Sequence, residues 1–328
     1  MRIPTNIVTG FLGVGKTTAI LDLLARKGGG ERWAVLVNEY GEVSIDHAIL
    51  EGGGRDGVTV QEVAGGCVCC ATAPYLHIAL HLLLTEAKPH RLIVETTGLG
   101  HPSRLIDTLR GNYSDRLDVR ATITVVSPDD FTTPKMLENP VFREQVDLAD
   151  VLVLNKLDRA EATVVSDFQT WANALYPPKL LIAATQSGRL EREWLDLGGS
   201  SLALTLASEA NTEAVETPTR PVPEPGRPLR FISAGSPPAC GWIFSPRDVF
   251  HEMDLLRFLG ELSGTSRVKG VFRVEDDWLT INRVGTSTTV SPTSYRRDSR
   301  VEIFADEIEI DWLHVEGQLL GCLVPSRV

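Results

Sequence analysis

The sequence predicts an α/β protein in which a domain with a mostly parallel sheet is followed by a smaller α+β domain. Apolar runs that suit buried strands alternate with helical patterns through residues 3–182. This alternation is typical of a parallel sheet covered by helices on both faces. Beyond residue 229 the pattern changes to a helix, several alternating strands and a final helix. The length of 328 residues also exceeds that of one typical core.

A segment rich in Ser, Thr, Glu and Pro separates the two patterns. It covers residues 198–228 and ends in a proline-rich run. Such a composition is typical of a partly extended, semi-rigid linker. We therefore expect a first domain at 1–197 and a C-terminal domain at 229–328.

The elements expected in each domain follow from apolar runs and from apolar residues at helical spacing. Strands are expected at 7–8, 33–38, 58–63, 92–94, 121–126, 151–154 and 180–182, and helices from 19 to a glycine stop at 28–30, at 74–87, at 139–148 and at 162–175. In the C-terminal domain we expect helices at 246–262 and about 306–320, with strands between 268 and 304.

The most informative stretch is residues 10–18, which read Gly-Phe-Leu-Gly-Val-Gly-Lys-Thr-Thr. It follows an apolar strand and precedes a helical pattern, which is the context that a phosphate-binding P-loop requires. Backbone N–H groups of residues 13–18 can surround a β-phosphate, and the helix N-terminus adds partial positive charge. Lys16 would reach the β- and γ-phosphates, and the Thr17 hydroxyl would bind Mg²⁺. The sequence therefore predicts a P-loop NTPase domain, whose loop contacts come from Gly10, Gly13, Val14, Gly15, Lys16, Thr17 and Thr18.

A second motif selects the base. Asn155, Lys156 and Asp158 follow the apolar strand 151–154 as Asn-Lys-Leu-Asp. A carboxylate at Asp158 can accept hydrogen bonds from N1–H and the exocyclic amine of guanine, a donor pair that adenine lacks. Lys156 would lie along the base, and Asn155 would tie this loop to the phosphate loop. We therefore expect GTP, with a backbone N–H from residues 183–185 meeting guanine O6.

The segment Glu95-Thr-Thr-Gly98 follows the strand 92–94. We expect the Glu95 carboxylate to hold Mg²⁺ through water and the Gly98 N–H to contact the γ-phosphate. The alternative is an ordinary helix N-terminus with Thr and Glu in its first turn.

Three cysteines lie within four positions, at Cys67, Cys69 and Cys70. Three thiolates can bind one soft or borderline cation, whereas adjacent cysteines form a disulfide only with strain. So short a segment leaves one ligand position open, which suits metal transfer better than a permanent structural site. Three buried small side chains are the alternative interpretation. The fourth ligand could come from Glu39, Glu42 or His47, each of which could equally be a solvated loop residue.

Composition excludes several classes of protein. A net charge of −11 argues against unspecific nucleic-acid binding. The chain has no apolar run near the length of a membrane span and no signal-peptide pattern, so we expect a cytoplasmic protein. In a reducing compartment the cysteine cluster indicates metal or redox chemistry, while Cys240 and Cys322 are expected to be isolated core residues.

In their order along the chain, these motifs resemble those of the CobW-like family of P-loop GTPases, which are proposed metal chaperones related to the nickel-inserting urease and hydrogenase GTPases. The resemblance rests on the phosphate loop, on Asn-Glu-Tyr-Gly-Glu-Val-Ser-Ile-Asp-His at 38–47, on Gly-Gly-Cys-Val-Cys-Cys at 65–70, on Glu-Thr-Thr-Gly-Leu-Gly at 95–100 and on Asn-Lys-Leu-Asp at 155–158. Arg-Val-Lys-Gly at 267–270 is similar to an element of that family's C-terminal domain. The resemblance implies that Cys-x-Cys-Cys is the metal site and that Zn²⁺ is its first metal, with Co²⁺ or Fe also possible.

The sequence departs from the family pattern at several positions. Ser44 replaces a glycine, Gly100-His101 replaces Ala-Asp, and no histidine-rich tract is present in the linker. His101 is therefore either an added metal ligand or a surface residue.

The function expected from the sequence is a GTP-hydrolysing metallochaperone that passes its metal to a client protein. No arginine finger is evident, so turnover should be slow unless metal, self-association or the client accelerates it. Segment 39–47 lies where a GTP-sensing switch is expected, so nucleotide and metal affinities should be linked. The alternatives are a GTPase whose cysteines sense oxidation, a P-loop kinase for a small metabolite, and a passive metal store.

Overall fold

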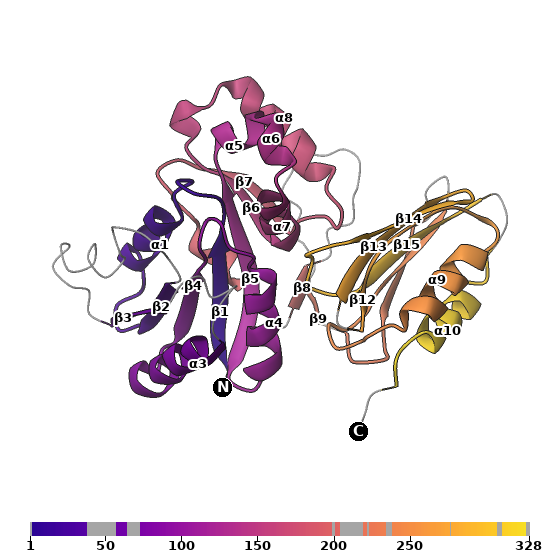
Figure 1. Cartoon of the computed structure of the whole chain (residues 1–328), viewed down its shortest axis with the longest axis horizontal. Helices are drawn as coiled ribbons and strands as arrows, with labels where there is room; N and C mark the ends of the chain where they lie inside the picture. Colours follow the sequence, from indigo (N-terminus) through magenta and orange to yellow (C-terminus); the bar gives the residue numbers. More distant parts are fainter. Residues whose placement is uncertain are drawn as a thin grey trace. The chain divides into compact units, whose positions relative to one another are not determined.

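The chain forms two compact units, residues 1–221 and 222–328 (Figure 1). The structure is a computed structural model that describes residues 2–37, 57–63, 73–198, 201–203, 219–221, 223–233, 238–275, 277–306 and 310–325. Within these ranges, no helix combines the length and the apolar composition needed to cross a bilayer.

The first unit is built on a seven-stranded sheet in which every neighbouring pair of strands is parallel. The strand order is β3-β2-β4-β1-β5-β6-β7, so β1 lies in the middle with β4 and β5 beside it (Figure 1). This arrangement confirms the predicted parallel sheet. The strands are β1 Ile3–Thr9, β2 Trp33–Val37, β3 Val58–Glu62, β4 Arg91–Glu95, β5 Leu117–Val126, β6 Val151–Leu154 and β7 Leu181–Ala184.

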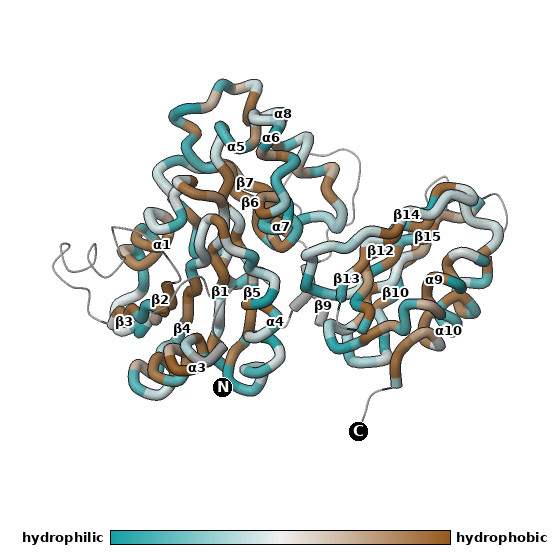
Figure 2. The backbone as a smooth tube through the Cα atoms, in the orientation of Figure 1, coloured by the Kyte–Doolittle hydropathy of each residue, from teal (hydrophilic) through white to brown (hydrophobic). Residues whose placement is uncertain are grey.

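Helices pack on both faces of this sheet because several of its strands are apolar on both sides. The runs Trp-Ala-Val-Leu-Val in β2 and Val-Leu-Val-Leu in β6 are hydrophobic throughout (Figure 2). In β4, Ile93 packs with the cluster that includes α1, whereas Leu92 and Val94 pack with α3 and α4 on the other face. The helices named here are α1 Lys16–Ala25, α3 Ala73–Leu82, α4 Ser103–Asn112, α7 Pro140–Leu148 and α8 Ala162–Asn173, of which α7 and α8 pack against β6.

Several boundaries differ from those predicted. Strand β5 begins at Leu117 rather than at residue 121, because its first residues pair with β1 although they alternate between apolar and polar and form no apolar run. The helix expected at 74–87 is α3 followed by a π-helical turn at Leu83–Ala87. The short helices α5 Pro128–Thr132 and α6 Pro134–Leu137 were not predicted.

The segment expected to be a linker contains two short strands. β8 Ser201–Ala203 pairs antiparallel with β9 Thr219–Pro221. The two strands are three residues each, too short to produce an alternating pattern that sequence analysis could detect.

The second unit is a six-stranded antiparallel sheet with two helices, which confirms the predicted α+β class. Its strand order is β10-β11-β15-β12-β13-β14. Helices α9 and α10 share a buried core with one face of the sheet, built around Trp242, Phe250 and Phe272. The elements are β10 Leu229–Ser233, β11 Ala239–Ile243, α9 Glu252–Glu261, β12 Thr265–Val274, β13 Asp277–Val284, β14 Ser287–Pro292, β15 Arg300–Ala305 and α10 Trp312–Gly321.

Both helices of this unit begin later than predicted. Asp248 closes a turn by accepting the backbone N–H of Ser245 at 3.0 Å, so α9 starts at Glu252 instead of residue 246. Asp311 caps α10 by accepting the N–H groups of Leu313 and His314, so α10 starts at Trp312 instead of about residue 306.

Arg283 on β13 closes the end of α9. Its side chain is buried, and it donates to the carbonyl oxygens of Leu259 at 2.7 Å, Leu262 at 2.8 Å and Gly260 at 3.3 Å. These are carbonyls that the helix itself leaves without partners. Arg283 therefore joins α9 to the sheet.

We predict that Arg283→Leu lowers the free energy of unfolding of the second unit by about 3 kcal/mol, because it removes the donor from several buried carbonyls. Denaturant unfolding of the full chain measures this change. Arg257→Gln on the exposed side of α9 is the control and should change stability by less than about 0.5 kcal/mol. Equal effects of the two substitutions would contradict the role of Arg283.

Candidate functional site

The phosphate loop connects the end of β1 to the start of α1 and depends on glycine at two positions. Gly10 has φ +139°, and a Cβ there would lie 2.1 Å from the carbonyl oxygen of Val125. Gly15 has φ +102°, and a Cβ there would lie 2.6 Å from Nδ2 of Asn155. Any other residue at either position would be strained and would clash. The loop therefore packs directly against β5 and against the loop that follows β6.

Residues from two neighbouring strand ends meet beside this loop. Glu95, the last residue of β4, is fully buried and pairs in register with Val8 of β1. Its Oε1 accepts a hydrogen bond from Oγ1 of Thr17, at the start of α1, at 2.8 Å. Lys16 is also buried, and its Nζ donates to the carbonyl oxygen of Phe11 at 3.0 Å. A hydroxyl and a carboxylate in contact are hard oxygen donors of the kind that Mg²⁺ prefers, so the residues present fit that ion.

The loop that follows β4 lies against the phosphate loop. A Cβ on Gly98 would come within 2.7 Å of the backbone nitrogen of Leu12 and 2.9 Å of its Cα. Only glycine permits this approach of the two backbones. The structure thus brings Lys16, Thr17, Glu95 and Gly98 into one neighbourhood.

Asn155 joins three loops. Its Nδ2 donates to the carbonyl oxygen of Val14 at 2.9 Å, and its Oδ1 accepts the N–H of Gly188 at 3.0 Å. The predicted tie between the Asn-Lys-Leu-Asp loop and the phosphate loop is therefore confirmed. In the same loop, Lys156 has a left-handed backbone with φ +61°, and Asp158 is exposed.

Residues 183–185 do not all follow the last strand, contrary to the expectation. Ala183 and Ala184 belong to β7 itself, and the N–H of Thr185 already donates to the carbonyl oxygen of Leu154 at 2.7 Å. Gly188 was not predicted; it has φ +70°, and a Cβ added there would lie 2.8 Å from the nitrogen of Ala19. The Ser-Gly pair at 187–188 is the turn signal that could have identified it.

The predicted metal ligands Cys67, Cys69, Cys70, Glu39 and Glu42, together with His47, lie outside the described residues. Within the described ranges, no three His, Cys, Asp or Glu side chains come together as a possible metal site.

The cysteines of the second unit match the expectation of core residues. Cys240 and Cys322 are free and buried. Burial raises the pKa of the Cys240 thiol to about 12 and also raises that of Cys322. Both thiols are therefore protonated at neutral pH and poorly suited to metal binding.

Nδ1 of His101 is in hydrogen-bond contact with the carboxylate of Glu144 on α7. Glu144 is itself buried and also accepts hydrogen bonds from the backbone N–H and the hydroxyl of Ser103. His101 is therefore part of the contact between α7 and the loop after β4.

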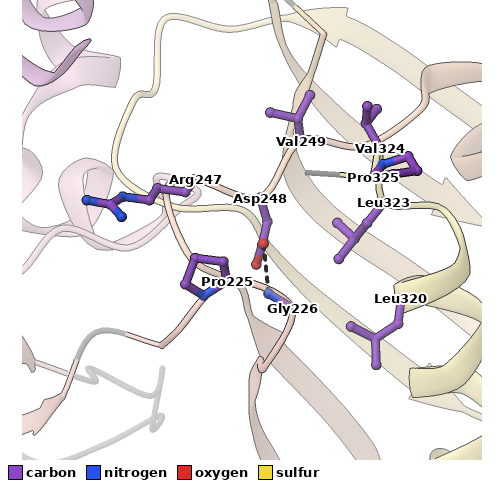
Figure 3. A pocket seen from close by; sticks show the side chains of 9 residues that line it. All are labelled: Pro225, Gly226, Arg247, Asp248, Val249, Leu320, Leu323, Val324 and Pro325. Carbon is purple, nitrogen blue, oxygen red and sulfur yellow. Dashed lines mark hydrogen bonds between the residues drawn. The ribbon is translucent and has the colours of Figure 1, made fainter. Parts of the chain in front are cut away.

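The second unit has a cavity of its own, of about 540 Å³ (Figure 3). Its wall is mostly apolar, and the carboxylate of Asp248 is engaged by the N–H of Gly226 at 2.9 Å (Figure 3). Burial raises the pKa of Asp248. This cavity shares no residue with the phosphate loop. Its lining is Pro225, Gly226, Arg247, Asp248, Val249, Leu320, Leu323, Val324 and Pro325.

Both units match known protein families. Residues 4–182 match the model of the CobW/HypB/UreG nucleotide-binding domain, and residues 239–323 match that of the cobalamin synthesis protein CobW C-terminal domain. The chain is 37% identical over 323 residues to the zinc chaperone YeiR of Escherichia coli K12, which covers 96% of this chain and 97% of YeiR. It is 33% identical over 190 residues to the zinc chaperone CobW of a Sinorhizobium species, which covers 49% of this chain and 53% of that protein.

Among solved structures, the chain is similar to the Zn(II)-bound YjiA GTPase of E. coli. The TM-score is 0.50 at 17% identity, and the similarity covers 98% of this chain and 99% of YjiA. At this identity the likeness concerns the fold. Together with the two family matches and the identity to YeiR over nearly the whole length of both chains, it leads to one conclusion: the chain belongs to the CobW/HypB/UreG family of nucleotide-binding proteins.

Proposed function

We propose that this protein is a GTP-hydrolysing metallochaperone that carries a transition metal, Zn²⁺ first, and delivers it to a client protein. The observation that carries this proposal is the 37% identity to a zinc chaperone along 96% of the chain. The contacts among the phosphate loop, Glu95 and Asn155 support it, because they form the framework of a nucleotide site.

The proposed nucleotide chemistry is positioning and charge stabilisation. Lys16 and the backbone N–H groups of the phosphate loop hold the phosphates, and the Gly98 N–H contacts the γ-phosphate. Thr17 and Glu95 would hold Mg²⁺, which when bound would neutralise charge on the β- and γ-phosphates. Asp158 reads the base, and Lys156 lies along it. The left-handed backbone at Lys156 supports this role because it turns the chain sharply just before Asp158.

The proposed metal site uses the thiolates of Cys67, Cys69 and Cys70, with Glu39 or Glu42 as a further ligand. Thiolates favour Zn²⁺, and Co²⁺ or Fe²⁺ can take the same ligands. The raised thiol pKa values of Cys240 and Cys322 support this cluster as the reactive set of cysteines. The GTP or GDP state gates release of the metal, because nucleotide and metal are expected to bias the same loops.

We predict that Asp158→Ala weakens GTP binding by at least about 30-fold, which corresponds to about 2 kcal/mol, because guanine loses a charged acceptor. ATP binding should be unaffected. Titration with fluorescent GTP and ATP analogues measures both affinities. Asp167→Ala, an exposed carboxylate on α8, is the control. Loss of GTP binding in the control, or none in Asp158→Ala, would argue against guanine recognition by this residue.

Asn155→Ala should weaken GTP and GDP about equally, by roughly tenfold, because it removes hydrogen bonds to two loops and touches no γ-phosphate. The same titration tests it. A loss confined to one of the two nucleotides would contradict a purely architectural role.

The decisive experiment measures Zn²⁺ and Co²⁺ affinity by competition with a chelating dye, with GDP and with a non-hydrolysable GTP analogue. We expect a tight site that disappears in the Cys67/Cys69/Cys70→Ala variant and whose affinity changes at least about tenfold, or 1.4 kcal/mol, between nucleotides. The Cys240/Cys322→Ala variant is the matched control and should keep the site. Phosphate release from GTP is followed in parallel.

Other outcomes select other functions. Metal affinity that is equal in both nucleotide states identifies a passive store. Absence of metal binding, with thiols that oxidise reversibly, identifies a redox-sensing GTPase.

A further inference from the structure

Two consecutive residues of α7 hold the loop that follows β4. Gln145 donates from Nε2 to the carbonyl oxygen of Gly98 at 3.1 Å. Glu144 is in hydrogen-bond contact with His101 and accepts from the hydroxyl of Ser103 at 2.7 Å. The first contact lies at the phosphate-loop end of this loop and the second at the start of α4. Helix α7 therefore fixes both ends of the segment 98–103.

Gly98 is held from two sides. On one side its backbone lies against Leu12 of the phosphate loop, with no room for a Cβ. On the other side its carbonyl oxygen accepts the hydrogen bond from Gln145. The Gly98 backbone is therefore positioned by the phosphate loop and by Gln145 together.

Packing of the core alone does not explain why a polar side chain is present at position 145. Its side chain is fully buried, and within the described part of the chain its Oε1 has no hydrogen-bond partner. The orientation of the amide is fixed, because a carbonyl oxygen accepts only and the NH₂ group must face it. A buried acceptor without a partner lowers stability, and an apolar side chain of the same volume would avoid that loss. The amide is thus of use chiefly through its contact with Gly98.

The helix that carries Gln145 is itself fixed to the nucleotide framework. Oγ1 of Thr124 on β5 donates to the backbone carbonyl of Gln145 at 2.7 Å. At the C-terminal end of α7, Nζ of Lys179 donates to the carbonyl oxygen of Val146 at 2.6 Å. The chain then enters β6 and reaches Asn155, which bonds back to Val14 of the phosphate loop. Helix α7 is therefore also held against the sheet by contacts that do not involve Gly98.

We propose that Gln145 is a positioning residue of the nucleotide site, which sets the Gly98 peptide at the place where it meets a γ-phosphate. This role rests on the proposed GTPase function, because only a triphosphate reaches Gly98. Gln145 acts through Gly98 and touches no nucleotide itself. Its loss should therefore affect GTP and its hydrolysis while leaving GDP binding intact.

The test compares Gln145→Met with wild type in the full chain. Methionine keeps the volume and the helix but removes the donor. We expect GDP affinity to stay within about twofold, affinity for a non-hydrolysable GTP analogue to fall at least about fivefold, and single-turnover GTP hydrolysis to slow at least about tenfold. General damage to the core would weaken both nucleotides, so the difference between GDP and the GTP analogue is the informative readout.

Thr124→Val is the matched control, because it removes a hydrogen bond to the backbone of the same residue and leaves the Gly98 contact in place. It should lower thermal stability without altering the ratio of GTP-analogue to GDP affinity. The proposal is overturned if Gln145→Met leaves that ratio and the hydrolysis rate unchanged, or if Thr124→Val changes them equally. A wild-type protein that binds GDP and the analogue but hydrolyses no GTP would overturn the proposed GTPase function, while the affinity ratio would still decide the role of Gln145.

Discussion

The amide of Asn155 is the contact on which the nucleotide site depends. One end of it holds Val14 in the phosphate loop and the other holds Gly188 in the turn after β7. The phosphate loop begins at β1, Asn155 follows β6, and Gly188 follows β7, so one side chain sets the spacing of three strand ends. Loops at the carboxyl edge of a parallel sheet lack the regular backbone hydrogen bonds that hold strands together. A side chain that bonds to two of these loops therefore fixes their positions.

The parallel sheet determines which residues can take part in chemistry. Strands β2 and β6 are apolar on both faces, and the polar side chain that β4 brings to the site comes from its last residue. Glu95 illustrates this, because it is the last residue of β4 and is buried between β1 and β2. The second unit is antiparallel and has one face covered by α9 and α10. There Arg283 completes the end of a helix.

Local patterns in the sequence predicted the parallel sheet, the phosphate loop and the tie made by Asn155. Each of these depends on a short run of residues whose spacing has a physical meaning. Gln145 and Glu144 could not be predicted, because polar residues within an amphipathic helix suggest a solvated face until its packing partner is known. The expectation that residues 183–185 follow the last strand failed because it placed the end of β7 too early. The pairing of β8 with β9 could not be predicted either, because neither three-residue segment shows the alternating pattern of a strand.

The central position of β1 has a consequence for the fate of the protein in a cell. Strand β1 pairs with β4 and β5, which lie far along the chain, so the position of the phosphate loop depends on residues 91–126 as well as on its own strand. A ligand of that loop then binds the folded first unit and not the unfolded chain. Such a ligand raises the free energy of unfolding. Once its concentration exceeds its dissociation constant, this gain increases with the logarithm of the ratio of the two. The survival of this protein against proteolysis is thereby linked to the nucleotide supply of the cell.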